Sequence, residues 1–141
     1  MPVIPLRPPC AFRQRTFLVL LLLLLLSACS TPSGVEGEWK EGKRHGKWTL
    51  RFGHGGRMAE GEFWQGKPIG FWTYWHENGL VAREGRYVDG LEEGEWTRWY
   101  ENGQMAEVGP YREGVKHGEW RLWAKDGEES KGVFEDGKRL E

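Results

Sequence analysis

The chain of 141 residues contains few cysteines, few apolar residues and no excess of positive charge. Two cysteines exclude a framework of several disulfides. Apolar residues make up 38% of the chain, too few for a large aliphatic core. Only seven residues are proline, and the glycines do not recur at every third position, which excludes collagen. The net charge is −1 and no basic face is visible, so nucleic acid is not expected as a partner.

Glycine and tryptophan are abundant instead, with 21 and nine copies. Aromatic residues make up 13% of the chain, which argues against disorder because disordered chains are poor in aromatics. A polar chain that is rich in both glycine and tryptophan predicts many tight turns joining short aromatic strands.

The N-terminus has the order of a bacterial export signal. Residues 1–16 carry three arginines and no acid, and residues 17–26 form an unbroken apolar run. A permanent membrane span needs about 20 such residues, so the run predicts a cleaved signal peptide. The sequence Leu26-Ser27-Ala28-Cys29 that follows resembles the bacterial lipobox, whose cysteine receives the lipid.

This resemblance implies a division of the chain into segments and a location in the cell. Residues 1–28 would be the lipoprotein signal peptide, and residues 29–36 would be the lipidated Cys29, carrying acyl chains such as palmitate, and a short tether. Ser30 stands where an aspartate would retain such a protein in the inner membrane. We therefore expect attachment to the outer membrane through the N-terminal lipid, on its periplasmic side or at the surface.

The remaining chain repeats every 24 residues, from residue 37 to residue 141. The period is set by Gly46, Gly70, Gly94 and Gly118, each followed two residues later by a tryptophan. Eighteen of the 21 glycines and eight of the nine tryptophans hold register positions. The array consists of a leading half unit and four units.

Each unit contains two turn signals. Pairs such as Asn78-Gly79 predict tight hairpins in which both residues have positive φ, and segments such as 90–94 predict a second, wider turn. The expected fold is all-β, an elongated antiparallel meander of stacked hairpins with about nine strands and no helix after the signal peptide. Trp96 and Trp99 are three residues apart, so either both sheet faces are aromatic or a bulge brings the two rings to one face.

The pattern G-x-W-x-x-W/Y-x-x-N-G, followed by G-x-Y-x-x-G-x-x-x-G, resembles the MORN repeat in its bacterial variant form. It departs from it at Arg51 and Phe52 in the first unit, and the last unit is one residue short. The resemblance implies a non-enzymatic interaction module, here a lipid-anchored scaffold that binds a protein. Direct binding of anionic lipid is disfavoured, because residues 29–141 carry 17 basic and 21 acidic side chains.

The periodic tryptophans are architectural first, but a repeated row of aromatic rings is also a surface for docking. The candidate binding residues are Trp48, Trp72, Trp75, Trp96, Trp99, Trp120 and Trp123. A protein partner is the first expectation. The first alternative is a glycan of the cell envelope, since short Trp/Gly repeats of wall-binding modules look similar. The second alternative is an antitoxin-like or immunity protein, as which bacterial variant-repeat proteins are often described.

No residues are expected to carry catalysis, a metal or a cofactor. His45 and His117 hold the same repeat position 72 residues apart, so they cannot converge on one zinc ion. No serine lies in a nucleophile elbow. Glu95 and Glu119 follow the repeat, whereas an active site normally breaks repeat symmetry.

Overall fold

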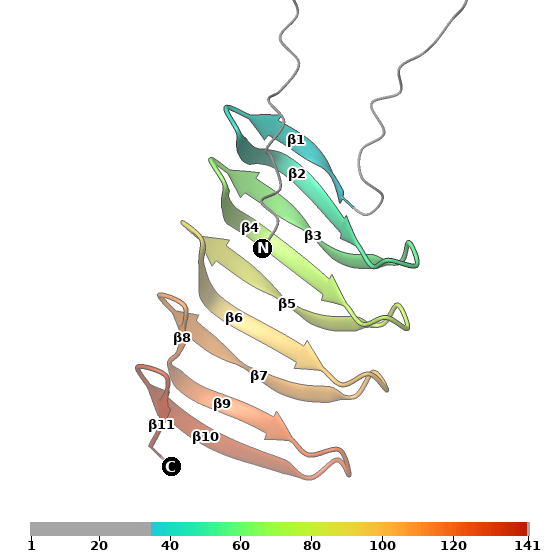
Figure 1. The fold of residues 1–141 in the computed structure, drawn as a ribbon. Coiled ribbons are helices and arrows are strands. Elements are labelled where there is room, and N and C mark those ends of the chain that lie inside the picture. Colours follow the sequence, from blue (N-terminus) through green and yellow to red (C-terminus); the bar gives the residue numbers. More distant parts are fainter. Residues whose placement is uncertain (1–34, 141) are drawn as a thin grey trace, which may run out of the picture.

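The computed structural model describes residues 35–140, which form a single antiparallel sheet of eleven strands (Figure 1). The predicted signal peptide, Cys29 and most of the tether lie outside the described residues. The strands are Val35–Lys40 (β1), Lys43–Arg51 (β2), Arg57–Trp64 (β3), Lys67–Trp75 (β4), Val81–Val88 (β5), Leu91–Trp99 (β6), Met105–Arg112 (β7), Val115–Lys116 (β8), Gly118–Trp123 (β9), Glu129–Glu135 (β10) and Lys138–Arg139 (β11).

The strands follow one another across the sheet in chain order, and β8 and β9 both pair with β7 (Figure 1). Nine strands have six residues or more, and β8 and β11 have two each. The predicted all-β meander of successive hairpins is confirmed, and the described residues contain no helix. It follows that none of these residues belongs to a helix able to cross a membrane.

The two turn types are the reverse of the prediction. In the Asn78-Gly79 turn only Gly79 has a positive φ, of 84°, and Gly79 N–H donates to the carbonyl of His76. Asn78 instead accepts a hydrogen bond from Leu80 N–H through its side chain, which holds it outside the left-handed region. The wider turn expected at residues 90–94 is instead a two-residue hairpin at Asp89 and Gly90, where both φ values are positive, 51° and 92°, and residues 91–94 lie in β6.

The sheet buries one of its faces, here called the packed face, with rings placed over glycines. On this face Trp48, Trp72, Trp96 and Trp120 are 1–3% exposed. An ideal Cβ built on Gly61 would lie 2.1 Å from the Trp72 ring, so this position has no room for a side chain. The Trp72 Nε1–H donates to the carbonyls of Glu62 and Ile69, at 3.3 and 3.1 Å, which are ladder partners next to the register shift between β3 and β4. The indole therefore replaces ladder hydrogen bonds that the register shift removes.

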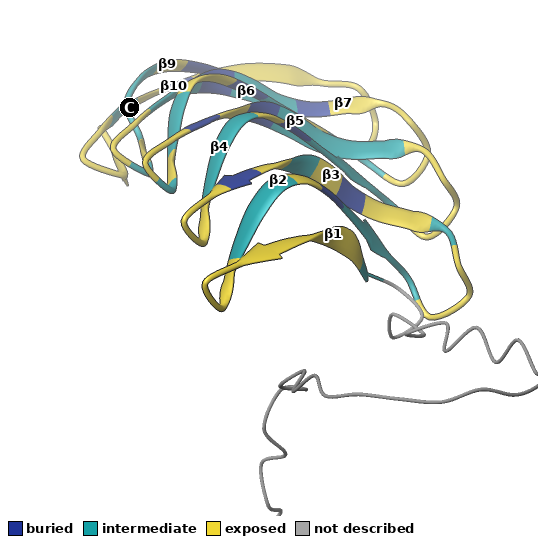
Figure 2. Ribbon diagram, turned by 90° about the horizontal axis from the view of Figure 1, so that it is seen from above, coloured by how far each residue is buried: buried dark blue, intermediate teal, exposed yellow. Residues whose placement is uncertain are grey.

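The rings of the packed face form one continuous row across the strands. Neighbouring rings meet edge to face, with centroids 4.9–6.1 Å apart, a favourable arrangement for aromatic pairs. The row runs through Trp39, Trp48, Phe63, Trp72, Tyr87, Trp96, Tyr111, Trp120 and Phe134. Figure 2 shows that the strands are arched and that buried residues lie at the middle of their length.

Candidate functional site

The opposite face of the sheet, here called the open face, carries Thr49, Thr73 and Thr97. It also carries three of the predicted tryptophans, Trp75, Trp99 and Trp123, one on every second strand. The register shift beside Trp99 comes from an extra residue in β7, so β6 keeps its alternation and Trp99 lies opposite Trp96. Both faces of the sheet are therefore aromatic.

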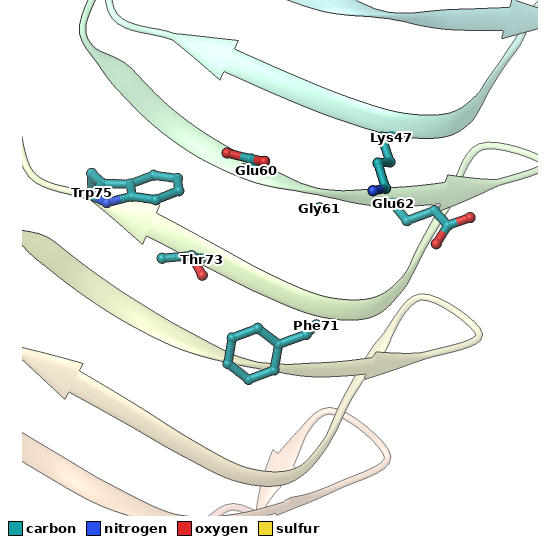
Figure 3. Close-up of a pocket in the computed structure, with 7 residues that line it drawn as sticks. All are labelled: Lys47, Glu60, Gly61, Glu62, Phe71, Thr73 and Trp75. Carbon is teal, nitrogen blue, oxygen red and sulfur yellow. The ribbon is translucent and has the colours of Figure 1, made fainter.

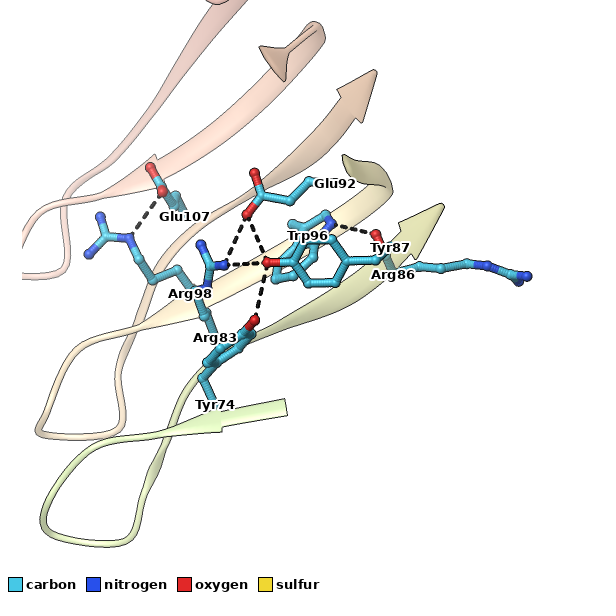
Figure 4. Close-up of polar contacts among 8 residues, drawn as sticks. All are labelled: Tyr74, Arg83, Arg86, Tyr87, Glu92, Trp96, Arg98 and Glu107. Carbon is cyan, nitrogen blue, oxygen red and sulfur yellow. Dashed lines mark hydrogen bonds and ion pairs between the residues drawn. The ribbon is translucent and has the colours of Figure 1, made fainter. Parts of the chain in front are cut away.

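The packed face is covered by hydrogen-bonded and charged side chains as well as by its aromatic rings. The hydroxyls of Tyr74 and Tyr87 lie 3.1 Å apart, and Arg83 donates to the Tyr87 hydroxyl at 2.8 Å (Figure 4). Arg83 also pairs with Glu92 at 2.9 Å, and its guanidinium lies 4.8 Å from the centre of the Trp96 ring. These contacts link residues from both ends of the bent strands.

A second group of polar contacts covers the packed face nearer the C-terminus. Glu107 accepts hydrogen bonds from Arg98 at 3.0 Å and from Lys116 at 2.7 Å. Lys116 also lies 4.0 Å from the centre of the Trp120 ring. The cavity among these residues holds about 20 Å³, which leaves no room for a ligand.

The titration of these groups fits a structural role. Burial and the hydrogen bond with Tyr74 raise the pKa of Tyr87 far above its ordinary value of 10. Burial alone would raise the pKa of Glu107, but hydrogen bonds and positive charge from Lys116 and Arg98 outweigh it and lower that pKa below 4.5. The phenol thus stays protonated and the carboxylate stays charged, each held by its neighbours.

The structure therefore separates the seven candidate tryptophans into two sets. Four of them, Trp48, Trp72, Trp96 and Trp120, are enclosed in the packed face and present almost no surface. The other three are half-buried and form one row on the open face. Two strand spacings separate neighbours in this row, about 9–10 Å.

Cations flank two of the three open-face rings. The guanidinium of Arg57 lies 4.6 Å from the centre of the Trp75 ring. That of Arg121 lies 4.8 Å from the centre of the Trp123 ring. Trp75 pairs with Val81 and Trp99 with Met105 in the ladder, so apolar residues fill the strands between the tryptophans. The row is therefore an amphipathic strip across four strand pairs.

A depression of about 360 Å³ lies at the N-terminal end of this strip, over β2, β3 and β4 (Figure 3). Phe71 and Trp75 project beside it from β4, with Thr73 between them. Its other lining residues are Lys47, Glu60, Gly61 and Glu62. Two aromatic rings thus stand beside two carboxylates, a hydroxyl and an ammonium group.

Phe71 is an aromatic residue of this depression that the repeat pattern does not predict. It is 61% exposed, the same fraction as Trp39. The sequence does carry a signal for it, because the equivalent positions in the other units hold the charged residues Lys47, Glu95 and Glu119. An apolar residue at this one place breaks the repeat symmetry on the open face.

The other predicted positions form no site in the part of the chain that the structure describes. His45 lies in β2 and His117 between β8 and β9, and residues 35–140 contain no group of three or more possible metal ligands. Cys29 is outside these residues, so its acylation stays a prediction.

Comparison of the chain with protein-family models and with curated proteins gives no match.

Proposed function

We propose that the protein is a lipid-anchored, non-enzymatic scaffold of the bacterial cell envelope, built from MORN-type repeats, that binds a partner protein on its open face. The observation that carries this proposal is the row of Trp75, Trp99 and Trp123. Tryptophan and arginine are the residues most enriched at the energetic centres of protein interfaces, and the row combines both.

The packed face supports the assignment of the binding site to the open face, because its own side chains already contact one another. Its rings contact one another and its charged groups are paired with one another, so it has little to offer a partner. A single-layered sheet stabilised in this way leaves its second face to the solvent and to other molecules. Half-exposed apolar side chains in a row on that face are typical of an interaction surface.

Site-specific photo-crosslinking in intact cells tests the proposal. A photoreactive phenylalanine analogue replaces Trp99 or Trp123, and the matched control replaces Val88, an exposed apolar residue near the opposite turn edge. We expect a discrete crosslinked product from the two open-face positions and none from position 88, with Trp75→Ala weakening the product. Equal products from all three positions, or none from the open face, would contradict the proposal. An exported toxin as the captured protein would favour an immunity role.

The lipid anchor is tested separately with Cys29→Ser. Without its thiol the residue cannot form a thioether to lipid, so incorporation of a clickable palmitate analogue should be abolished and the protein should leave the membrane fraction or stay unprocessed. Cys10→Ser is the matched control and should be labelled normally. Unchanged labelling of Cys29→Ser would refute the predicted anchor.

A further inference from the structure

We infer that the depression over β2, β3 and β4 is a binding site for a neutral pyranose disaccharide. The site shares Trp75 with the strip proposed to bind a protein, and its other lining residues lie outside that strip. The inference therefore does not depend on the identity of a partner protein.

The aromatic residues of the depression supply one half of the required chemistry. A pyranose has faces made of C–H groups, which stack on aromatic rings. Phe71 and Trp75 stand on the same side of β4 with Thr73 between them, so both rings border one space (Figure 3). Phe71 is 61% exposed and forms no ring contact within the aromatic row, so folding gains little from an aromatic residue there.

The polar residues supply the other half. The carboxylates of Glu60 and Glu62 accept hydrogen bonds from sugar hydroxyls, and the Thr73 hydroxyl and the Lys47 ammonium donate them. Aromatic rings combined with hydrogen-bonding groups at fixed positions are what a flat, polyhydroxylated ring requires. A purely apolar ligand would remove water from both carboxylates without offering them a hydrogen bond.

The local charges favour an uncharged ligand. Lys47 is the ladder partner of Glu62, and Arg57 lies 3.5 Å from the Glu60 carboxylate. Each acid thus has a cation near it, and with Arg57 counted the charges around the depression balance. Its volume of about 360 Å³ is near the lower end of small-molecule sites, about 300–1,000 Å³, which suits two sugar rings better than a long chain.

Binding is measured on the full-length lipidated protein in a detergent without a sugar head group. The probes are cellobiose and N,N′-diacetylchitobiose, followed by calorimetry and by saturation-transfer NMR. We expect saturable binding of at least one of them. Phe71→Lys installs the residue that the first unit carries at the equivalent position, and it should weaken binding at least about tenfold, since a ring stack is lost.

Glu62→Gln is the second variant and should weaken binding without altering the aromatic residues. Val133→Lys, which places the same charge on an exposed apolar site in β10, across the sheet from the depression, should bind as the unmodified protein does. Far-UV circular dichroism checks that each variant folds.

Three outcomes would overturn the inference. One is no binding of either disaccharide at millimolar concentration, and another is binding that survives both Phe71→Lys and Glu62→Gln. The third is loss of the photo-crosslinks from positions 99 and 123 in Phe71→Lys without any sugar binding, which would assign Phe71 to the protein interface. Failure of the crosslinking experiment alone leaves the sugar titration unaffected, so the two proposals fail separately.

Discussion

At the scale of single residues, the fold depends on pairs of one glycine and one tryptophan. Gly37, Gly61, Gly85 and Gly109 each lie beneath the ring of a tryptophan on a neighbouring strand of the sheet, with an ideal Cβ 2.1–2.4 Å from ring atoms. These four glycines have no left-handed backbone, so space rather than conformational freedom requires them. The glycines with positive φ, such as Gly90 in its hairpin, are required for the opposite reason.

Gly61→Ala tests the requirement for space. Its methyl group would overlap the Trp72 ring, which is enclosed by neighbours and cannot withdraw. We expect a loss of about 3 kcal/mol in the free energy of unfolding, measured by urea denaturation followed by tryptophan fluorescence. Gly53→Ala is the control, because no atom lies within 4 Å of its ideal Cβ, and it should change stability by less than about 1 kcal/mol. Equal losses in the two variants would contradict this explanation.

At the scale of strands and hairpins, the packed face is held across its bend by polar contacts that break the repeat. Arg83 reaches Glu92 and Lys116 reaches Glu107, whereas Ala59 occupies the position in β3 that Arg83 occupies in β5. The middle of the array is therefore tied together by ion pairs and its N-terminal part by apolar contacts. Units that are similar in sequence are thus stabilised by different interactions across the bend of the sheet.

Glu107→Gln tests the ion pairs. The carboxylate bonds to both Arg98 and Lys116 and is largely buried, so the variant should lose about 2 kcal/mol in the free energy of unfolding at about pH 7. The pKa of Glu107 is lower in the folded state than its ordinary value of 4.5, so the stability it contributes is present above pH 4.5 and is lost as the pH falls through the folded-state pKa. The difference between the two proteins should therefore shrink toward about pH 3.

Glu129→Gln is the control for this experiment. Glu129 pairs with Arg121 at 2.8 Å on the exposed surface, where solvent screens the interaction. Its replacement should affect unfolding much less than that of Glu107. A difference between wild type and Glu107→Gln that is independent of pH would contradict the role assigned to the carboxylate.

At the scale of the whole molecule, the sheet is a one-dimensional array in which each strand contacts its immediate neighbours (Figure 1). Stability in such an array is the sum of the units and of the interfaces between them. Central strands have a paired neighbour on both sides, whereas β1 pairs with β2 and β11 pairs with β10 among the described residues. The molecule should therefore open from its ends.

Hydrogen–deuterium exchange followed by mass spectrometry tests this order. Backbone amides of β5 and β6 should exchange more slowly than those of β1 and β11, because opening a central strand breaks two ladders. Uniform protection across the sheet would show instead that the array unfolds as one unit.

Much of this architecture could be predicted because the spacing of glycine and tryptophan in the repeat determines it. The glycine and tryptophan spacing predicted antiparallel hairpins in chain order, and the sheet has them. The turn types could not be read correctly from Asn78-Gly79, because the Asn78 side chain bonds to Leu80 N–H and keeps its own φ negative. Candidate binding residues were harder still, since Trp72 and Trp75 look alike in sequence and lie on opposite faces.

The sequence by itself determined the period, the number of units and the succession of antiparallel hairpins. The periodic glycines and aromatic residues encode these features, because each enclosed tryptophan needs a glycine beneath its ring at a fixed distance along the chain. Only the tertiary structure decided which tryptophans are enclosed and which stand on the open face, and it alone gathered Phe71, Trp75 and two carboxylates around one depression. Those residues come from neighbouring strands, and their proximity depends on register, bulges and twist, which the repeat pattern does not encode residue by residue.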